Sequence, residues 1–233
     1  MRRPLSLALA QPPCTPRDPA ANAEGHAAMI RAAGARVVVF PELSLTGYEL
    51  DADPVDPADP RLAPLVAAAR DADAIALVGA PVAGAAGKHI GVLEVTGDGV
   101  RVAYRKMFLG GAEPQHCVPG VVPAVLAVDG WRLGLAVCKD TGVPEHSAAT
   151  AALEIDAYVA GVLDAPHELR IQEERAARIT RDHRVWVALA SFAGSTGGGY
   201  DEAAGCSRAW GPNGDLVAQA GPEVGAILPV TLT

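Results

Sequence analysis

Short apolar runs of strand length alternate along this chain with longer segments whose apolar residues have helical spacing. That alternation is typical of layered α/β domains, in which helices pack on the faces of a sheet. The segment 36–40 (RVVVF) is apolar on both faces and is expected to be a strand that is covered on both sides. Expected helices span 19–33, 61–70, 144–154 and 166–184. Expected strands span 5–10, 36–40, 74–79, 89–96, 100–106, 124–128, 131–137, 157–162, 185–191, 206–211, 216–220 and 226–230.

The expected strands far outnumber the expected helices. Such a ratio predicts either one large sheet curled on itself or two stacked sheets with helices outside. Gly97-Asp98-Gly99 separates two of the strands and is a strong hairpin signal. The prolines of segment 51–60 forbid a central strand or a helix interior, so a surface loop is expected there. The composition shows no break and no repeat recurs at a fixed period, so residues 1–233 are expected to form a single domain.

The charge balance narrows the choice of partners. The chain carries 19 basic and 27 acidic residues, a net charge of -8, and no cluster of Lys and Arg beyond pairs. A nucleic-acid groove or an anionic membrane surface would need a basic stripe. We therefore expect a small-molecule substrate, with no nucleic acid and no membrane as partner. The longest weakly polar stretch, 74–87, is shorter than the ~20 residues that a bilayer demands.

The cysteines and the start of the chain indicate the compartment. Cys14, Cys117, Cys138 and Cys206 lie far apart and form no C-x-x-C pair, which disfavours a zinc ribbon or a dithiol redox motif. Free thiols are the default in a reducing compartment. The apolar run after Arg2 and Arg3 imitates a signal peptide but ends before the ~15–30 residues that such a signal needs. We expect a cytoplasmic protein.

Several widespread sequence motifs are incomplete or absent in this chain. Gly87-Lys88 lacks the first glycine and the Ser or Thr of a phosphate loop. The glycine run 197–199 lacks the third glycine of a dinucleotide-binding fingerprint and is interpreted as a flexible loop. His167-Glu168 is not followed by a second zinc ligand, and no G-x-S-x-G elbow occurs. A zinc enzyme and a serine hydrolase of the α/β type are both disfavoured.

Cys138 stands directly after the expected strand 131–137, on the face that carries small residues. A turn follows, and Pro144 then opens a helix. A thiol near a helix start gains from the positive end of the helix dipole, which predicts a lowered pKa and a larger thiolate fraction. The alternative is a buried cysteine that acts as a small hydrophobic residue.

Glu42 and Lys106 also end strands. Glu42 follows the buried run 36–40, at the place where ligands bind in open α/β sheets. Burial of a carboxylate is costly unless it has a partner or a task, although a solvated loop glutamate would have the same sequence. Lys106 ends a third strand, where most lysines are simply solvated. Together with Cys138 they supply a base, an oxyanion stabiliser and a nucleophile, which are the parts needed for acyl transfer.

Three ordered motifs resemble those of the carbon-nitrogen hydrolase, or nitrilase, superfamily. The segment VVVFPELSLTGY (37–48) resembles its glutamate motif around Glu42. YRKMFLGGAEPQHCVPG (104–120) resembles its lysine motif, with Lys106 and a second active-site glutamate at Glu113. GLAVCKDTGVPE (134–145) resembles its nucleophile motif around Cys138. LALAQ (7–11), Glu174-Arg175-Ala176 and GCSRAWGPNGDLVA (205–218) also fall in family order, so the resemblance covers nearly the whole chain.

The resemblance implies a four-layer αββα sandwich of two stacked mixed sheets, which in this family usually dimerises, and no metal or organic cofactor. It implies that Glu42 takes the Cys138 proton, that the thiolate attacks an amide, carbamoyl or nitrile carbon, and that Lys106 stabilises the oxyanion. Glu113 would orient Lys106 or the substrate. The leading expectation is cofactor-free hydrolysis of a small amide or carbamoyl compound through a cysteine thioester. Nitrile hydrolysis, acyl transfer to an amine and a catalytically silent binding subunit are the alternatives.

Some positions depart from the family pattern. Cys117 stands where Phe is common, Lys139 where Tyr is common, and Val143 where Phe often precedes Pro144. The run RAARITRD (175–182), which includes Arg178, replaces the common Arg-Ala-x-Glu-Asn run. These positions shape the neighbourhood of the nucleophile, so they leave the substrate, the choice between water and an amine as acceptor, and the oligomeric state open.

Overall fold

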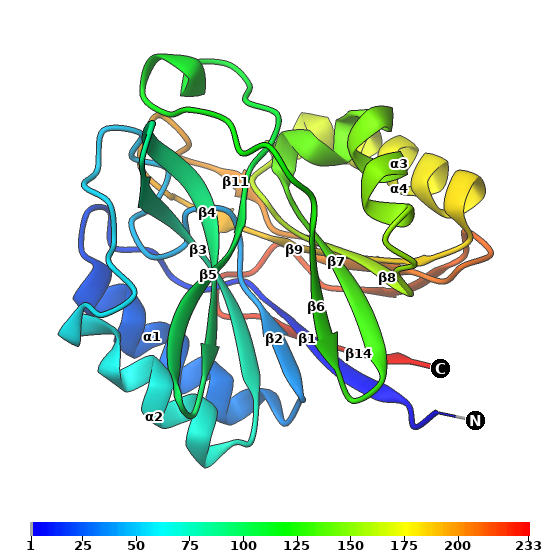
Figure 1. Ribbon diagram of the computed structural model, residues 1–233, viewed down its shortest axis with the longest axis horizontal. Coiled ribbons are helices and arrows are strands. Elements are labelled where there is room, and N and C mark those ends of the chain that lie inside the picture. Colours follow the sequence, from blue (N-terminus) through cyan, green and yellow to red (C-terminus); the bar gives the residue numbers. More distant parts are fainter. Residues whose placement is uncertain (1) are drawn as a thin grey trace.

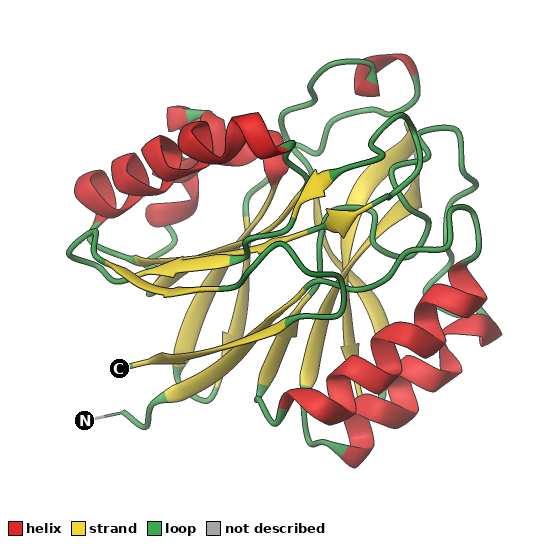
Figure 2. Ribbon diagram, turned by 180° about the vertical axis from the view of Figure 1, so that it is seen from behind, coloured by secondary structure: helices red, strands yellow, loops and turns green. Residues whose placement is uncertain are grey.

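The computed structural model describes residues 2–233 and shows two six-stranded sheets stacked face to face, with helices on both outer faces (Figure 1). The layers therefore follow the order αββα. The view from behind also shows helices on both outer faces (Figure 2). The prediction of a four-layer sandwich of two stacked sheets is confirmed, and the alternative of one curled sheet is not.

The first sheet has the strand order β14-β1-β2-β3-β4-β5. Its three central strands β1, β2 and β3 run parallel, whereas β14, β4 and β5 join by antiparallel pairing. The sheet is therefore mixed. Its strands are β1 (Leu5–Ala10), β2 (Val37–Val39), β3 (Ile75–Gly84), β4 (Gly87–Thr96), β5 (Gly99–Arg105) and β14 (Ile227–Leu232).

The second sheet has the order β13-β12-β9-β8-β7-β6 and the same plan. Strands β7, β8 and β9 are parallel, and β6, β12 and β13 are antiparallel to their neighbours. Its strands are β6 (Ala124–Val128), β7 (Trp131–Val137), β8 (Ala157–Val162), β9 (Trp186–Ser191), β12 (Arg208–Trp210) and β13 (Leu216–Gln219). A small third sheet pairs β10 (Ala193–Gly194) with β11 (Ala203–Ala204).

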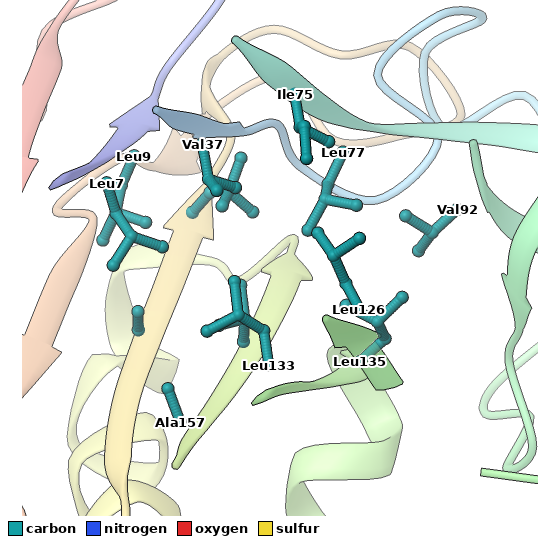
Figure 3. Packing of buried hydrophobic residues seen from close by; sticks show 14 of the residues in the cluster. Leu7, Leu9, Val37, Ile75, Leu77, Val92, Leu126, Leu133, Leu135 and Ala157 are labelled. Atoms are coloured by element: carbon teal, nitrogen blue, oxygen red, sulfur yellow. The ribbon is translucent and has the colours of Figure 1, made fainter. Parts of the chain in front are cut away.

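Side-chain alternation along the strands divides the apolar residues between three layers of core. In β1, Leu7 and Leu9 point into the space between the sheets, while Ala8 and Ala10 face the helices. Figure 3 shows the inner layer, where residues such as Leu77 from the first sheet face Leu126 from the second. Each Leu or Val that is fully buried in this way contributes roughly 1.5–3 kcal/mol relative to an exposed position.

Helices cover the two outer faces. The first sheet carries α1 (Pro19–Ala33) and α2 (Ala63–Asp71), and the second carries α3 (Pro144–Ala151) and α4 (Leu169–His183). Helix α1 begins where Asp18 accepts hydrogen bonds from the backbone N–H groups of Ala20 and Ala21, and it ends at left-handed Gly34. Short 3₁₀ helices lie at Pro60–Leu62 (η1), Glu113–Gln115 (η2), Cys138–Gly142 (η3) and Pro166–Glu168 (η4).

Several predicted boundaries were wrong. Strand β3 continues through Pro81. Strand β2 pairs with β3 only as far as Leu77, so no strand on that side needs the backbone N–H that proline lacks. The helix expected over 166–184 is divided into η4 and α4, and the helix expected over 144–154 ends at Ala151. The strand expected over 206–211 shrinks to β12, and β10 and β11 were not predicted.

Among residues 2–233, none of the helices combines the length and the apolar character that are needed to cross a membrane.

Candidate active site

The predicted site residues lie at strand ends from both sheets. Glu42 lies in the turn after β2, and Lys106 directly follows β5. Glu113 opens η2 in the loop that follows, and Cys138 opens η3 at the end of β7. Strands β2, β3 and β5 run in the same direction, so the chain leaves the first sheet at one edge after both β2 and β5. In Figure 1 the long green loop after β5 rises above this edge.

Lys106 lies between two carboxylates. Its Nζ donates to Oε1 of Glu42 at 2.7 Å and to Oε1 of Glu113 at 2.6 Å. All three residues are buried, with 1 %, 1 % and 2 % of their surfaces exposed in the order Lys106, Glu42, Glu113. Removing charges from water is costly, so such a cluster persists only where each charge is compensated. The sequence motifs predicted these three residues, and the structure joins them.

Three donors hold Glu113. Besides Lys106, the Tyr48 hydroxyl donates to its Oε1 at 2.8 Å and the Gly110 backbone N–H donates to its Oε2 at 2.8 Å. Both oxygens of this buried carboxylate are therefore satisfied. Glu42 differs, because its Oε2 is buried and has no hydrogen-bond partner within residues 2–233. That oxygen is free to accept a proton.

The charges of the cluster set its protonation. Burial raises the pKa of Glu42 to about 7, because the nearby charge of Glu113 adds to desolvation and the ammonium of Lys106 offsets only part of it. Burial alone would lower the pKa of Lys106, but the electrostatic effects of Glu42, Cys138 and Glu113 outweigh it and raise that pKa. Lys106 therefore stays cationic, while Glu42 has the pKa of a general base for neutral solution.

Cys138 is partly buried and has a left-handed backbone, with φ at 38°. Its Sγ–H donates to the carbonyl oxygen of Leu163 at 3.6 Å. Burial raises the pKa of the Cys138 thiol well above its ordinary value, the charge of Glu42 raises it further, and Lys106 lowers it. The predicted pKa decrease from a helix start was therefore wrong, because desolvation outweighs any effect of the short η3. Glu42 and Lys106 thus act on the pKa of this thiol in opposite directions.

Asp140 ties the Cys138 turn to the Lys106 loop. Its Oδ2 accepts from the Val137 N–H at 2.9 Å and from the Tyr104 hydroxyl at 2.8 Å, and its Oδ1 accepts from the Phe108 N–H at 2.9 Å. The carboxylate thus fixes the backbone just before the nucleophile and two residues after the lysine. The sequence analysis missed this residue, although its place two positions after Cys138 was a usable signal.

A buried histidine extends this network. His146 Nε2 lies 2.8 Å from the Tyr104 hydroxyl, and His146 Nδ1 lies 2.8 Å from the Tyr158 hydroxyl. Tyr104 donates its one proton to Asp140, so His146 donates from Nε2 and accepts at Nδ1 from Tyr158. Burial lowers the pKa of His146, which keeps the ring neutral. Arg178, in the segment that departs from the family pattern, donates to the carbonyl oxygens of Thr141 and Gly142 at the end of η3.

Two glycines allow the segment before Glu42 to pass between the sheets. A Cβ atom at Gly79 in β3 would lie 2.2 Å from the Pro41 carbonyl oxygen, and one at Gly161 in β8 would lie 2.5 Å from that of Phe40. Neither gap admits a methyl group without movement of the backbone. The close approach therefore requires glycine on both sheets.

Replacing Gly161 by alanine is expected to destabilise the fold by about 1–3 kcal/mol through overpacking. It should also displace Glu42, and a shift of ~1 Å costs about 100-fold in rate. Urea denaturation and kcat/KM on a hydrolysed amide measure the two effects. The matched control is Gly25→Ala in α1, where the nearest atom lies 4.0 Å from the new Cβ and alanine should stabilise the helix by roughly 1 kcal/mol. Equal stability and rate for the two variants would contradict the packing argument.

No group of three or more His, Cys, Asp or Glu side chains within residues 2–233 is arranged to hold a metal ion.

Comparison with known families identifies the chain. The family model described as carbon-nitrogen hydrolase matches residues 6–232. The chain belongs to the carbon-nitrogen hydrolase family. A search of curated proteins found no match for this hydrolase. The resemblance drawn from the motifs around Glu42, Lys106 and Cys138 is therefore confirmed at the level of the family.

Solved structures agree with the assignment. The hydrolase is 25% identical to a mutant amidase from Nesterenkonia sp. AN1, which shows the result of Michael addition of acrylamide at the active-site cysteine; the TM-score is 0.87, and the match covers 98% of this chain and 93% of that chain. Another mutant of that amidase, from the nitrilase superfamily, is 26% identical, with a TM-score of 0.87 and coverage of 98% and 90%. Saccharomyces cerevisiae Nit3, a member of branch 10 of the nitrilase superfamily, shares the fold at 22% identity and a TM-score of 0.86, with coverage of 99% and 90%. The two amidase structures support a hydrolase of carbon-nitrogen bonds.

Proposed function

We propose that this hydrolase cleaves the C–N bond of a small amide or carbamoyl compound through a thioester on Cys138. The observation that carries the proposal is the buried ammonium of Lys106, held between Glu42 and Glu113 within electrostatic reach of the thiol. Such a cluster is expensive to bury and supplies a base, a cation and a nucleophile in one place. The amidase neighbours with an active-site cysteine support the same chemistry.

In the first half-reaction, Oε2 of Glu42 takes the Sγ proton and the thiolate attacks the carbonyl carbon. Lys106 stabilises the negative charge that develops on the carbonyl oxygen. Glu42 then returns the proton to the leaving nitrogen, the C–N bond breaks, and ammonia or an amine departs from the thioester.

In the second half-reaction, water replaces the amine. Glu42 takes a proton from this water, the hydroxide adds to the thioester carbon, and Lys106 again stabilises the oxyanion. The C–S bond breaks, the acid leaves, and the sulfur recovers the proton from Glu42. Glu113 orients Lys106 throughout and balances its charge, because the same Nζ binds both carboxylates.

The test is hydrolysis of a panel of small amides, carbamoyl compounds and nitriles, with ammonia and acid measured separately. Release of ammonia and acid in equal amounts from an amide supports the proposal. An added alkylamine distinguishes acyl transfer, which would convert the product from the acid to an N-alkyl amide. Preferential turnover of nitriles would favour that alternative, and failure to turn over any compound would favour a silent binding subunit.

The rate should depend on pH through Glu42. Its pKa of about 7 lies above the usual carboxyl range because of burial, so the base is protonated and inactive at lower pH. We expect kcat/KM to fall about tenfold per pH unit below 7 and to level off above it. A pH profile from 5 to 9 measures this dependence. An acid limb centred near pH 4.5 would show that the base is a solvated carboxylate instead.

We further propose that residues 1–233 act as one hydrolase domain in the cytoplasm, as a homodimer or larger homo-oligomer with a small-molecule substrate. The family match over 6–232 and the four free cysteines support the single domain and the reducing compartment. Light scattering on the purified chain tests the oligomeric state.

A further inference from the structure

The glycine run 197–199, interpreted from the sequence as a flexible loop, lies in a hydrogen-bonded turn between β10 and β11. Tyr48 donates its backbone N–H to the carbonyl oxygen of Thr196 at 2.9 Å, and Gly198 donates its N–H to Oε1 of Glu49 at 3.2 Å. A Cβ atom at Gly198 would lie 1.9 Å from the Tyr48 carbonyl oxygen, and its φ is 58°. The turn therefore packs tightly on the segment that carries Tyr48, and only glycine fits there.

Glu49 is itself held in place. Arg17 binds Oε2 of Glu49 at 2.6 Å and Oδ1 of Asp51 at 2.7 Å. The carboxylate that receives the Gly198 N–H is thus connected to the start of the chain and to the loop after β2. The turn is therefore hydrogen-bonded to the segment that carries Tyr48.

The turn places Tyr200 against Tyr48. Tyr200 closes the turn through hydrogen bonds with Gly197 and Thr196, at 3.0 Å and 2.9 Å. Its ring meets that of Tyr48 edge to face, with centroids 5.1 Å apart, and Tyr48 is the residue whose hydroxyl binds Glu113. Tyr200 also packs on the apolar cluster that contains Leu163, whose carbonyl oxygen accepts from the Cys138 thiol.

Two further properties suit a residue that contacts substrate. Tyr200 is partly exposed, and no hydrogen bond from its hydroxyl is present within residues 2–233. Burial raises the pKa of Tyr200, and the charges of Glu168, Cys138, Glu42 and Glu113 raise it further. The phenol therefore stays neutral.

We propose that Tyr200 is a specificity-determining residue whose ring forms one wall of the acyl-binding site beside Cys138. It restricts the substrate to amides of short aliphatic acids, because a branched or aromatic acyl group would meet the ring. As a statement about substrate choice, this inference rests on the proposed function. The position of the wall can be tested without turnover.

The test is a pair of alkylating reagents with the same reactive group and different size, iodoacetamide and N-benzyl iodoacetamide. Mass spectrometry of the Cys138 peptide separates its labelling from that of the other three cysteines. Wild type should react at least tenfold faster with the small reagent. Tyr200→Ala should reduce this preference by about tenfold, the size of effect that one missing apolar contact has on discrimination.

Tyr200→Phe keeps the ring and should keep the preference, and Leu216→Ala, an exposed truncation on β13, should also leave it unchanged. If Tyr200→Ala melts early, Tyr200→Leu gives the same comparison with a smaller loss of packing. A preference that stays within twofold of wild type in the folded alanine or leucine variant overturns the proposal.

The amide panel separates this inference from the proposed function. Tyr200→Ala should raise kcat/KM for isobutyramide relative to acetamide by about tenfold. A changed labelling preference without any amide turnover would support Tyr200 as a wall of the site and contradict the proposed amide hydrolysis. Amide turnover with unchanged preferences in both assays would support the proposed hydrolysis and contradict the role of Tyr200 as a wall.

Discussion

Cys138→Ala is expected to lower kcat for amide hydrolysis on the order of 10⁶-fold, the scale seen when an enzyme that works through a covalent intermediate loses its nucleophile. Neither Glu42 nor Lys106 can form the acyl intermediate in its place. The fold should remain, because the sulfur makes a single weak hydrogen bond, to Leu163. Ammonia release and intact-mass analysis measure the rate and the absence of an acyl adduct, and a thermal melt confirms folding.

The matched control is Cys206→Ala, which removes another partly exposed free thiol outside the site. Its kcat should stay within about twofold of wild type. A Cys138→Ala protein that retains a tenth of the wild-type rate would remove the thioester from the mechanism, whatever else remained true of the cluster.

Local sequence rules predicted the strands and their two faces well. The alternation of Leu7 and Leu9 with Ala8 and Ala10 is visible in the sequence, and it decides which residues fill the space between the sheets. The same rules place Glu42 and Cys138 at strand ends. They do not say which strand ends meet, because that depends on the strand order in two sheets. The ordered motifs around Glu42, Lys106 and Cys138 supplied that information through family resemblance.

The contacts that the sequence analysis missed span long separations. Asp140 binds Phe108 and Tyr104, more than 30 positions earlier, and Arg178 reaches Thr141 from α4. The periodicity of apolar residues in the sequence gives no information about such contacts. The wrong pKa direction for Cys138 has a related cause, since burial by residues from both sheets decides it and the local helix start does not. The close contact of Gly198 with the Tyr48 carbonyl oxygen was likewise not visible in the sequence, because the two residues are remote from each other.

Lys106→Met is expected to affect stability and activity together. The change leaves Glu42 and Glu113 buried without their shared cation, and removal of one partner from a buried ion cluster costs about 3–5 kcal/mol. It also removes the charge that stabilises the oxyanion, which costs roughly 10²–10³-fold in kcat. Urea denaturation and ammonia release measure the two effects.

The loss of stability should depend on pH. Without the ammonium, the pKa of Glu42 rises further above its value in the unfolded chain, so the folded variant binds more protons than the unfolded one near neutrality. Its free energy of unfolding therefore increases as the pH falls, and the deficit relative to wild type should be smaller at pH 5 than at pH 8.

Lys88→Met provides the matched control for this dependence. Lys88 donates to the carbonyl oxygens of Leu50 and Ala52 and not to a carboxylate, so its loss leaves no buried carboxylate without a partner. We expect the Lys88 deficit to be the same at both pH values. If the Lys106 deficit were also constant with pH, the two glutamates would have to be solvated in the variant. The protonation state of the buried cluster would then depend less on Lys106 than its contacts at 2.7 Å and 2.6 Å imply.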